Sequence, residues 1–334
     1  MPVRAYTDRS EGKAPVYQTF YGFTMMPFSV TPDTRFFFPS ARHSEALASL
    51  IYAVTERKGF ALLTGEIGSG KTTVARALLS HLDPDTRVAM VLNTHLTSKQ
   101  LLEVICGEFE LPIRNRDRIE LHAQINDYLV QQLAGDRNVV LLIDEAQNLA
   151  PRTLEEIRMI SNLETETEKL VQILLIGQPE LRQKIDSPEL RQLRQRINIR
   201  FHLSGLTREE MVQYVMHRLR VAGNETGPRF SRGAWRVVGR ASRGIPRLIN
   251  IVCDNALLIG YVRQTKRITE EIVREVAADL ALDGVTAADV PGPVRGVTGA
   301  ASPAPPRRPR GRLARARRLA REMLWRPFHR SAGA

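Results

Sequence analysis

The stretch TGEIGSGKTT, from Thr64 to Thr73, holds three glycines, one lysine and three threonines in ten residues. It matches the pattern G-x-x-x-x-G-K-[ST], with Gly65, Gly70, Lys71 and Thr72 at the fixed positions. Glycines in such a loop let backbone N–H groups turn toward phosphate oxygens. We therefore predict that Lys71 reaches the β- and γ-phosphates of ATP and that Thr72 binds Mg²⁺. The predicted nucleotide-binding residues of the loop are Gly65, Glu66, Ile67, Gly68, Ser69, Gly70, Lys71, Thr72 and Thr73.

The residues on either side of this loop have the pattern that a phosphate-binding loop requires. The apolar run GFALLT comes before it and is typical of a buried strand. The segment TTVARALLSHL follows, with apolar residues at helical spacing. The sequence therefore predicts a strand, a glycine loop and a helix whose N-terminus points at the anion.

Short apolar runs alternate with helical stretches through the first two thirds of the chain. After the first strand, the expected strands are RVAMVLN, NVVLLID, LVQILLIG and INIRFHL. Helices are expected near 97–110 and 117–134 and in LEEIRMISNL. This alternation predicts an α/β fold with a parallel five-stranded sheet covered by helices on both faces.

The expected domain organisation has four parts. Residues 1–204 form the P-loop core with an N-terminal linker, and residues 205–283 form a small all-helical lid with helices near 207–222, 231–242, 246–262 and 268–282. Residues 284–310 are rich in Gly, Pro and Ala and read as a linker. Residues 311–334 form a basic tail.

The positive charge of the chain is concentrated at its C-terminal end. Residues 291–334 contain eleven arginines and one acidic residue, Glu322, which amounts to +10 of the net charge of +12. On a helix, the apolar residues of the segment GRLARARRLAREMLWRPF share one broad face, and most of its arginines lie on the other. Arg312 and Arg317 intrude on the margins of the apolar face. Such a helix suits an anionic membrane surface. Binding to nucleic acid and a solvated, disordered tail remain alternatives.

Several classes of protein are not indicated by the sequence. The two cysteines, Cys106 and Cys253, lie in apolar surroundings without a CxxC pair, so we expect buried thiols in a reducing cytosol. The seven histidines lack metal-ligand spacing, so Mg²⁺ is the metal expected. We find no apolar stretch long enough to span a membrane and no signal peptide, and we expect a cytoplasmic protein.

The second motif is VVLLIDEAQNL, in which an apolar strand ends in Asp144 and Glu145. A carboxylate at this end of a strand can bind the Mg²⁺ shell, and its neighbour can polarise the attacking water. We assign the first role to Asp144 and the second to Glu145. The pair favours hydrolysis of ATP over binding alone.

Together these motifs carry a family resemblance. The P-loop, LLIDE and a helical lid with GIPRLIN resemble the AAA+ ATPases. From Tyr17 to Asp283 the chain more closely resembles the ExeA/GspA-type secretion ATPases. The segments that carry this resemblance are PFSVTPDTRFFFPSARHSEALASLIYAV, GEIGSGKTT, LIDEAQNL, IRMISNLETE, LLIGQPELR, LRQLRQRI and GIPRLINIVCDNALL. The resemblance implies a role in type II secretion or in exopolysaccharide export, with secretion or export membrane proteins as partners.

The resemblance also implies roles for residues outside the two motifs. Gln178 stands where a sensor-1 residue reads the γ-phosphate, and Arg247 in GIPR stands where a sensor-2 arginine touches the nucleotide. Arg194 and Arg196, with Arg191, occupy the place from which an arginine finger reaches a neighbouring subunit, which implies a homo-oligomeric ring or filament. His43 and FFFP are candidates for the adenine pocket, with core packing as the alternative.

We compare three functions with these observations. The first is a secretion or export ATPase. ExeA-type ATPases continue into a transmembrane helix and a peptidoglycan-binding domain, which we do not find here, so we expect the arginine tail to tether the ATPase to the inner membrane. The alternative is a DNA-associated AAA+ regulator of the TniB/TnsC transposition type, which the tail would also suit. A nucleotide-gated scaffold with little turnover is disfavoured by the intact Asp144 and Glu145.

Overall fold

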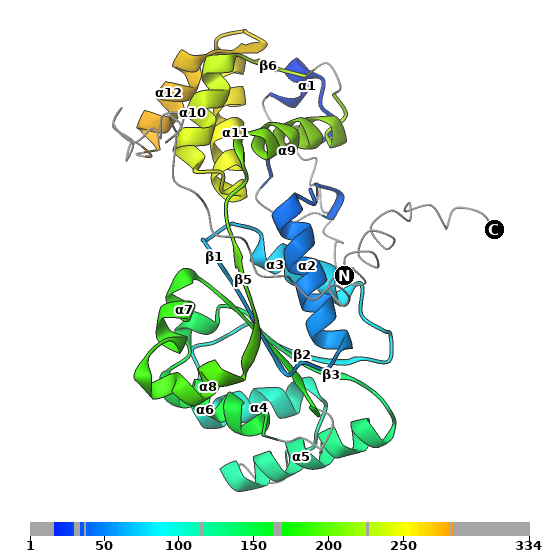
Figure 1. Cartoon of the computed structure of the whole chain (residues 1–334). Helices are drawn as coiled ribbons and strands as arrows, with labels where there is room; N and C mark the ends of the chain where they lie inside the picture. Colours follow the sequence, from blue (N-terminus) through cyan, green and yellow to red (C-terminus); the bar gives the residue numbers. More distant parts are fainter. Residues whose placement is uncertain are drawn as a thin grey trace, which may run out of the picture. The chain divides into compact units, whose positions relative to one another are not determined.

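The computed structural model of the chain describes residues 17–29, 34–36, 38–113, 117–162, 169–224, 227–280 and 282. The chain divides into two compact units (Figure 1). The α/β unit consists of the described residues from Pro39 to Ser204, and the helical unit combines those up to Phe38 with those from Gly205 onward. The expected linker, 284–310, and the basic tail, 311–334, lie outside the described residues.

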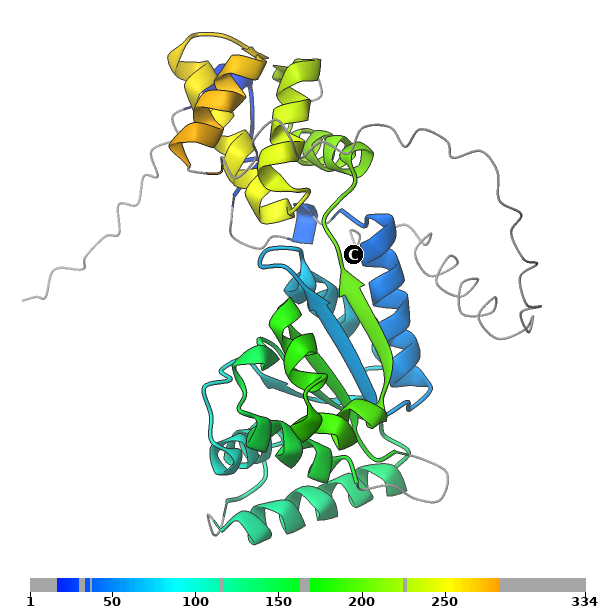
Figure 2. The same cartoon turned by 60° about the vertical axis from the view of Figure 1, so that its left-hand side comes forward.

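The α/β unit is built on a five-stranded parallel sheet with the strand order β2-β3-β4-β1-β5. All five predicted strands are confirmed. Figure 2 shows β1 beside β5, where the two strands run in the same direction. The strands are β1 (Phe60–Gly65), β2 (Arg87–Val91), β3 (Val139–Ile143), β4 (Gln172–Gly177) and β5 (Ile197–Leu203).

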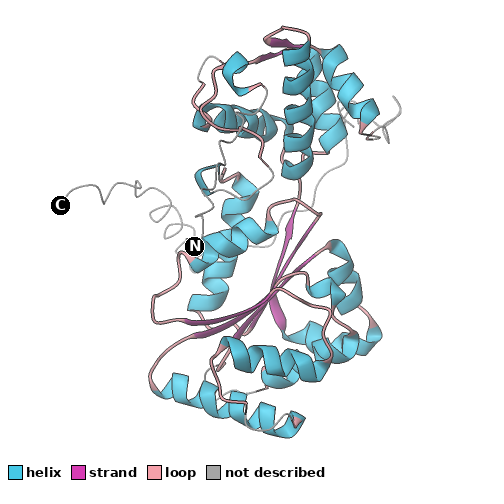
Figure 3. Cartoon of the chain, turned by 180° about the vertical axis from the view of Figure 1, so that it is seen from behind, coloured by secondary structure: helices cyan, strands magenta, loops and turns pink. Residues whose placement is uncertain are grey.

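Helices cover both faces of this sheet (Figure 3). The covering helices on one face are α2 (Ala41–Thr55) and α3 (Lys71–Leu79). Those on the other face are α4 (Ser98–Glu108), α5 (Arg118–Ala134), α6 (Pro151–Ile160), α7 (Pro179–Ile185) and α8 (Arg191–Arg196).

Strand β3 shows why its sequence is apolar at every position. Val139, Leu141 and Ile143 point into the core under α4–α8, whereas Val140 and Leu142 point into the core under α2 and α3. Successive side chains of a strand face opposite sides of the sheet, so a sheet covered on both faces needs an uninterrupted apolar run. Apolar burial on both faces stabilises the unit and fixes the register of the strands.

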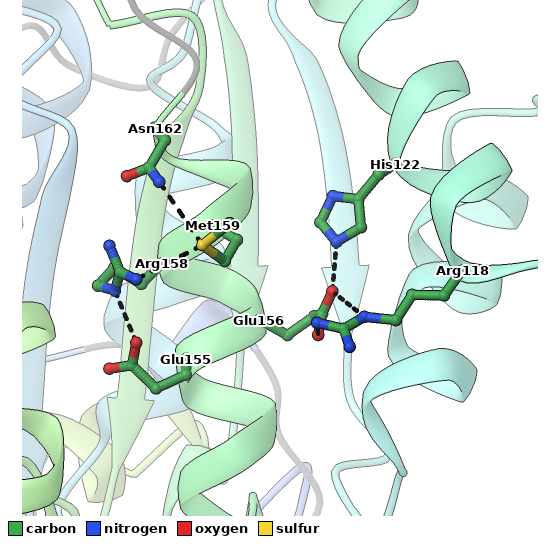
Figure 4. Close-up of polar contacts among 7 residues, drawn as sticks. All are labelled: Arg118, His122, Glu155, Glu156, Arg158, Met159 and Asn162. Atoms are coloured by element: carbon green, nitrogen blue, oxygen red, sulfur yellow. Dashed lines mark hydrogen bonds and ion pairs between the residues drawn. The ribbon is translucent and has the colours of Figure 1, made fainter.

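A buried carboxylate connects α5 to α6 on this second face. Glu156 of α6 is 2% exposed, and its Oε2 lies 2.7 Å from Nη2 of Arg118 on α5. His122 of α5 also contacts Oε1 of Glu156 (Figure 4). A buried charge is tolerated only when it is paired, and here both partners lie on the neighbouring helix. The ion pairs therefore hold α5 against α6.

The helical unit contains the four helices predicted after Ser204, together with two short strands. Contrary to the expectation of an all-helical lid, β6 and β7 pair in parallel over two residues each. Such short pairs leave no periodic signal in the sequence. The elements are α1 (Gln18–Tyr21), η1 (Thr34–Phe36), α9 (Arg208–Val221), β6 (Arg229–Phe230), α10 (Arg232–Ser242), α11 (Pro246–Val262), β7 (Arg267–Ile268) and α12 (Glu270–Asp279).

The described N-terminal residues pack into this helical unit, which differs from the expected boundary that grouped residues 1–204 together. Tyr17 and Tyr21 are buried in its core, and the Tyr21 hydroxyl donates to the Leu257 carbonyl of α11 at 3.1 Å. Arg218 of α9 donates from Nε to the Pro27 carbonyl at 2.6 Å. The apolar and aromatic N-terminal residues are therefore part of the helical unit's core.

Two further observations concern the chain as described. Cys106 and Cys253 are both buried and free, as expected. Burial raises the pKa of the Cys106 thiol to about 11, which makes it a poor nucleophile at neutral pH.

No helix among the described residues is both long enough and apolar enough to cross a membrane.

Candidate functional site

The sequence motifs meet at the carboxyl ends of three neighbouring strands. Strands β3, β4 and β1 are adjacent in the sheet, and the loops after them carry Asp144, Gln178 and the glycine-rich loop. In an open parallel sheet this edge is where ligands bind. The topology therefore brings together segments that lie far apart in the sequence.

The glycine-rich loop ends at the N-terminus of α3, which begins at Lys71. No side chain caps this helix, so its first N–H groups are available to an anion. Gly70 has a φ of +101°, and a Cβ at that position would lie 2.6 Å from Nε2 of His43. Only glycine fits there, because any side chain would clash with the imidazole and strain the backbone.

His43 contacts the glycine-rich loop directly, and its part in an adenine pocket stays a prediction. The imidazole is buried; its Nε2 lies 3.0 Å from the Ser69 carbonyl, and its Nδ1 lies 2.6 Å from Oγ of Ser40. Because a carbonyl only accepts, Nε2 carries the proton and Nδ1 accepts from Ser40. Phe36 of FFFP belongs to the core of the helical unit, which corresponds to the core-packing alternative.

Lys71 is buried at the base of the loop. Its Nζ donates to the carbonyls of Gly65 at 2.8 Å and of Glu66 at 3.0 Å. Burial lowers the pKa of this ammonium group, and the nearby carboxylates of Glu145 and Asp144 oppose the shift. A cation held among loop carbonyls is suited to exchange these partners for phosphate oxygens.

The two predicted magnesium ligands are in contact. The Thr72 hydroxyl donates to Oδ2 of Asp144 at 2.9 Å, and the Asp144 side chain is buried. One hydroxyl in the first turn of α3 and one carboxylate just after β3 fit Mg²⁺, which is usually bound by few protein oxygens with phosphates and water completing the shell. The donor set therefore fits the metal, although its role stays a prediction.

Glu145 follows in an unusual backbone conformation. Its φ is 51°, in the left-handed region that non-glycine residues rarely adopt. The conformation is held at both ends, because the Glu145 N–H donates to Oδ1 of Asp144 at 2.9 Å and its carbonyl accepts from Thr94 at 2.9 Å. Strain that is fixed by several contacts is typical of functional residues.

The structure places Gln178 directly against this glutamate. Gln178 follows β4, and its Nε2 lies 3.2 Å from Oε2 of Glu145. The amide of Gln147 donates to the same oxygen. Gln178 is thus in a position to respond to a group bound near Glu145. Gln147 is a site residue that the sequence does not predict, because its only sequence signal is a polar residue two positions after Glu145.

The predicted arginines are carried by α8 and α11 and not by the loops that form this cluster, and their roles stay predictions. Arg194 is exposed on α8, and its guanidinium makes no hydrogen bond or ion pair within the described part of the chain. Arg196 instead donates from Nη1 to the carbonyl and hydroxyl of Ser161, at 3.3 and 3.2 Å. Arg247 is exposed in the first turn of α11, in the helical unit.

Comparisons with known proteins agree with this architecture. A family model for the AAA domain matches residues 54–185. The general secretion pathway protein A of Aeromonas hydrophila is 46% identical over 254 residues, which cover 76% of this chain and 46% of that relative. The chain thus spans somewhat less than half of the relative's length.

Solved structures with the same fold include the following two. Cdc6p of Pyrobaculum aerophilum aligns with a TM-score of 0.59 at 19% identity, covering 78% of this chain and 72% of that one. A chain of the Drosophila ORC bound to DNA aligns with a TM-score of 0.60 at 17% identity, covering 84% and 70%. At these identities the similarity concerns the fold alone.

The sheet, the glycine-rich loop and the Asp144–Glu145 pair define a P-loop ATPase of the AAA+ class. Within that class, the sequence similarity to general secretion pathway protein A shows that the chain belongs to the ExeA/GspA-type family.

Proposed function

We propose that this chain binds ATP with Mg²⁺ and hydrolyses it, and that hydrolysis drives assembly or remodelling of a secretion or export apparatus. The observation that carries the proposal is the convergence of Lys71, the Thr72–Asp144 pair and Glu145 at one edge of the sheet. A site for binding alone would not need a carboxylate held beside the metal ligands.

Each residue has a distinct part in the proposed reaction. The loop N–H groups and Lys71 bind the phosphates, and Thr72 and Asp144 hold Mg²⁺, which neutralises phosphate charge when it is bound. Glu145 orients and polarises the attacking water. Gln178, beside that carboxylate, senses whether the γ-phosphate is present, and Arg247 is proposed to touch the nucleotide.

The test of this proposal is ATP hydrolysis by the purified chain with and without Mg²⁺. Lys71→Ala should abolish turnover, because the ammonium group that neutralises the β- and γ-phosphates is lost. Lys58→Ala, which changes a lysine outside the loop, is the matched control and should hydrolyse ATP like the parent. Unchanged turnover in Lys71→Ala would refute the nucleotide site.

The cellular role rests on similarity and on the arginine tail. The match to general secretion pathway protein A extends over 76% of this chain, which supports a role in secretion or export. We further propose a homo-oligomer in which Arg194 completes the site of a neighbouring subunit. The tail, outside the described residues, is proposed to hold the ATPase at the inner-membrane surface, and a DNA-associated regulator is the competing function.

A further inference from the structure

A glutamine beside the proposed catalytic carboxylate bridges the loops that follow β3 and β4. Gln147 lies in η2 (Ala146–Asn148), and its Nε2 donates to Oε2 of Glu145. Its Oε1 accepts from the backbone N–H of Gln178 at 3.0 Å. One side-chain amide therefore joins the carboxylate proposed to activate water to the residue proposed to sense the γ-phosphate.

The surroundings leave this amide a single orientation. Turning it over would place its NH₂ against the Gln178 N–H and its oxygen against the Glu145 carboxylate, and both contacts are repulsive. Gly177 allows the close approach, because a Cβ there would lie 2.6 Å from Oε1 of Gln147. Lys184 of α7 donates to the Gln147 and Leu149 carbonyls and holds the turn from the other side.

The hydrogen bonds to Glu145 are unevenly divided between its two oxygens. Oε2 accepts from both Gln147 and Gln178, whereas Oε1 has no hydrogen bond within the described part of the chain. A carboxylate that activates water needs one oxygen directed at the water and the other oxygen fixed. The observed division provides both.

We propose that Gln147 is a positioning residue for hydrolysis: it fixes Oε2 of Glu145 so that Oε1 faces the attacking water, and it links that carboxylate to Gln178. When the Gln178 side chain turns to a bound γ-phosphate, Gln147 still holds Glu145 in place. This inference rests on the proposed ATP hydrolysis and adds to it a residue that acts through Glu145 and Gln178.

A merely structural role for Gln147 makes different predictions from a positioning role. Loss of a structural contact would lower the thermal stability and weaken nucleotide binding together with turnover. Loss of a positioning contact lowers kcat while KM and nucleotide affinity stay the same, because the contact acts only on the reacting carboxylate.

The experiment replaces Gln147 by residues of similar length. Gln147→Met removes both hydrogen bonds and should lower kcat about tenfold, with KM and the affinity for a fluorescent ATP analogue within about twofold of the parent. Gln147→Glu keeps the length but adds a negative charge beside Glu145, and it should lower kcat at least as far. Gln131→Met, at an exposed glutamine of α5, is the matched control and should behave like the parent.

A double-mutant cycle tests whether Gln147 acts through Glu145. In the Glu145→Gln background, adding Gln147→Met should change the single-turnover rate by less than about twofold, because the carboxylate that it positions is gone. A kcat near the parent value in Gln147→Met, a parallel rise in KM, or an undiminished loss in the Glu145→Gln background would each overturn the proposal. If Gln147→Met does not fold, as judged by thermal unfolding, Gln147→Glu carries the same test.

The outcome is distinguishable from failure of the proposed function. A parent chain that binds the analogue but hydrolyses no ATP refutes hydrolysis itself and this inference with it. A parent that hydrolyses ATP, with inactive Lys71→Ala and fully active Gln147→Met, refutes only the role of Gln147.

Discussion

Replacing His43 by leucine tests how the glycine-rich loop is held in shape. The imidazole is 5% exposed and connects the Ser40 hydroxyl, at the start of α2, to the Ser69 carbonyl in the loop. Leucine has a comparable shape and can form neither hydrogen bond. Ser40 can keep its capping contact to the backbone N–H of residue 43, but the Ser69 carbonyl loses the imidazole donor.

The structure sets the expected size of the effect. Ser69 is 1% exposed, and a buried carbonyl left without its donor costs about 1–3 kcal/mol. A loss of about 2 kcal/mol lowers the melting temperature by roughly 4–8 °C in a unit of this size. In the His43→Leu variant the nucleotide must order the loop when it binds, because His43 no longer does so. Part of the binding free energy is then lost, and the affinity for ATP should fall about tenfold, which corresponds to roughly 1.4 kcal/mol.

Thermal unfolding and titration with a fluorescent ATP analogue measure the two effects. His81→Leu is the matched control, since His81 is exposed beyond the end of α3, and it should leave both values near those of the parent. The reasoning is refuted if His43→Leu melts and binds like the parent. It is also refuted if stability falls while nucleotide affinity is unchanged, because the contact would then not shape the loop.

Three further predictions concern chemistry, assembly and location. Glu145→Gln should bind ATP normally but hydrolyse it about a hundredfold or more slowly, because the water-polarising charge is lost while the phosphate loop is intact; turnover like the parent's would make Glu145 a bystander. Mixing inactive Lys71→Ala subunits with Arg194→Ala subunits should restore part of the activity if Arg194 acts on a neighbouring subunit. Arg196→Ala should also lower stability, because the parent Arg196 side chain donates hydrogen bonds to Ser161. No rescue, together with a specific activity that does not depend on protein concentration, would indicate a monomeric enzyme. The full chain should float with anionic liposomes, and a chain ending at Asp283 should not; equal flotation, or binding to DNA but not to vesicles, would favour the transposition-type function.

Local pattern was sufficient for much of this protein. The glycine loop between an apolar strand and a helix, the five strands and the four later helices follow from periodicity, composition and turn residues that act over a few positions. The same is true of the acidic pair at the end of β3. These features could be predicted because each depends on neighbours in the sequence, as the uninterrupted apolar run of β3 illustrates.

Only the tertiary structure decided which distant segments meet. The strand order β3-β4-β1 places Asp144 against Thr72 and Gln178 against Glu145. It also lets Gln147 contact both Glu145 and Gln178. Tertiary packing likewise places His43 against the phosphate loop and the N-terminal tyrosines in the core of the helical unit. Periodicity shows which face of an element is buried, but the partner is chosen by shape, strand pairing and hydrogen-bond satisfaction across the whole fold, which no local pattern contains.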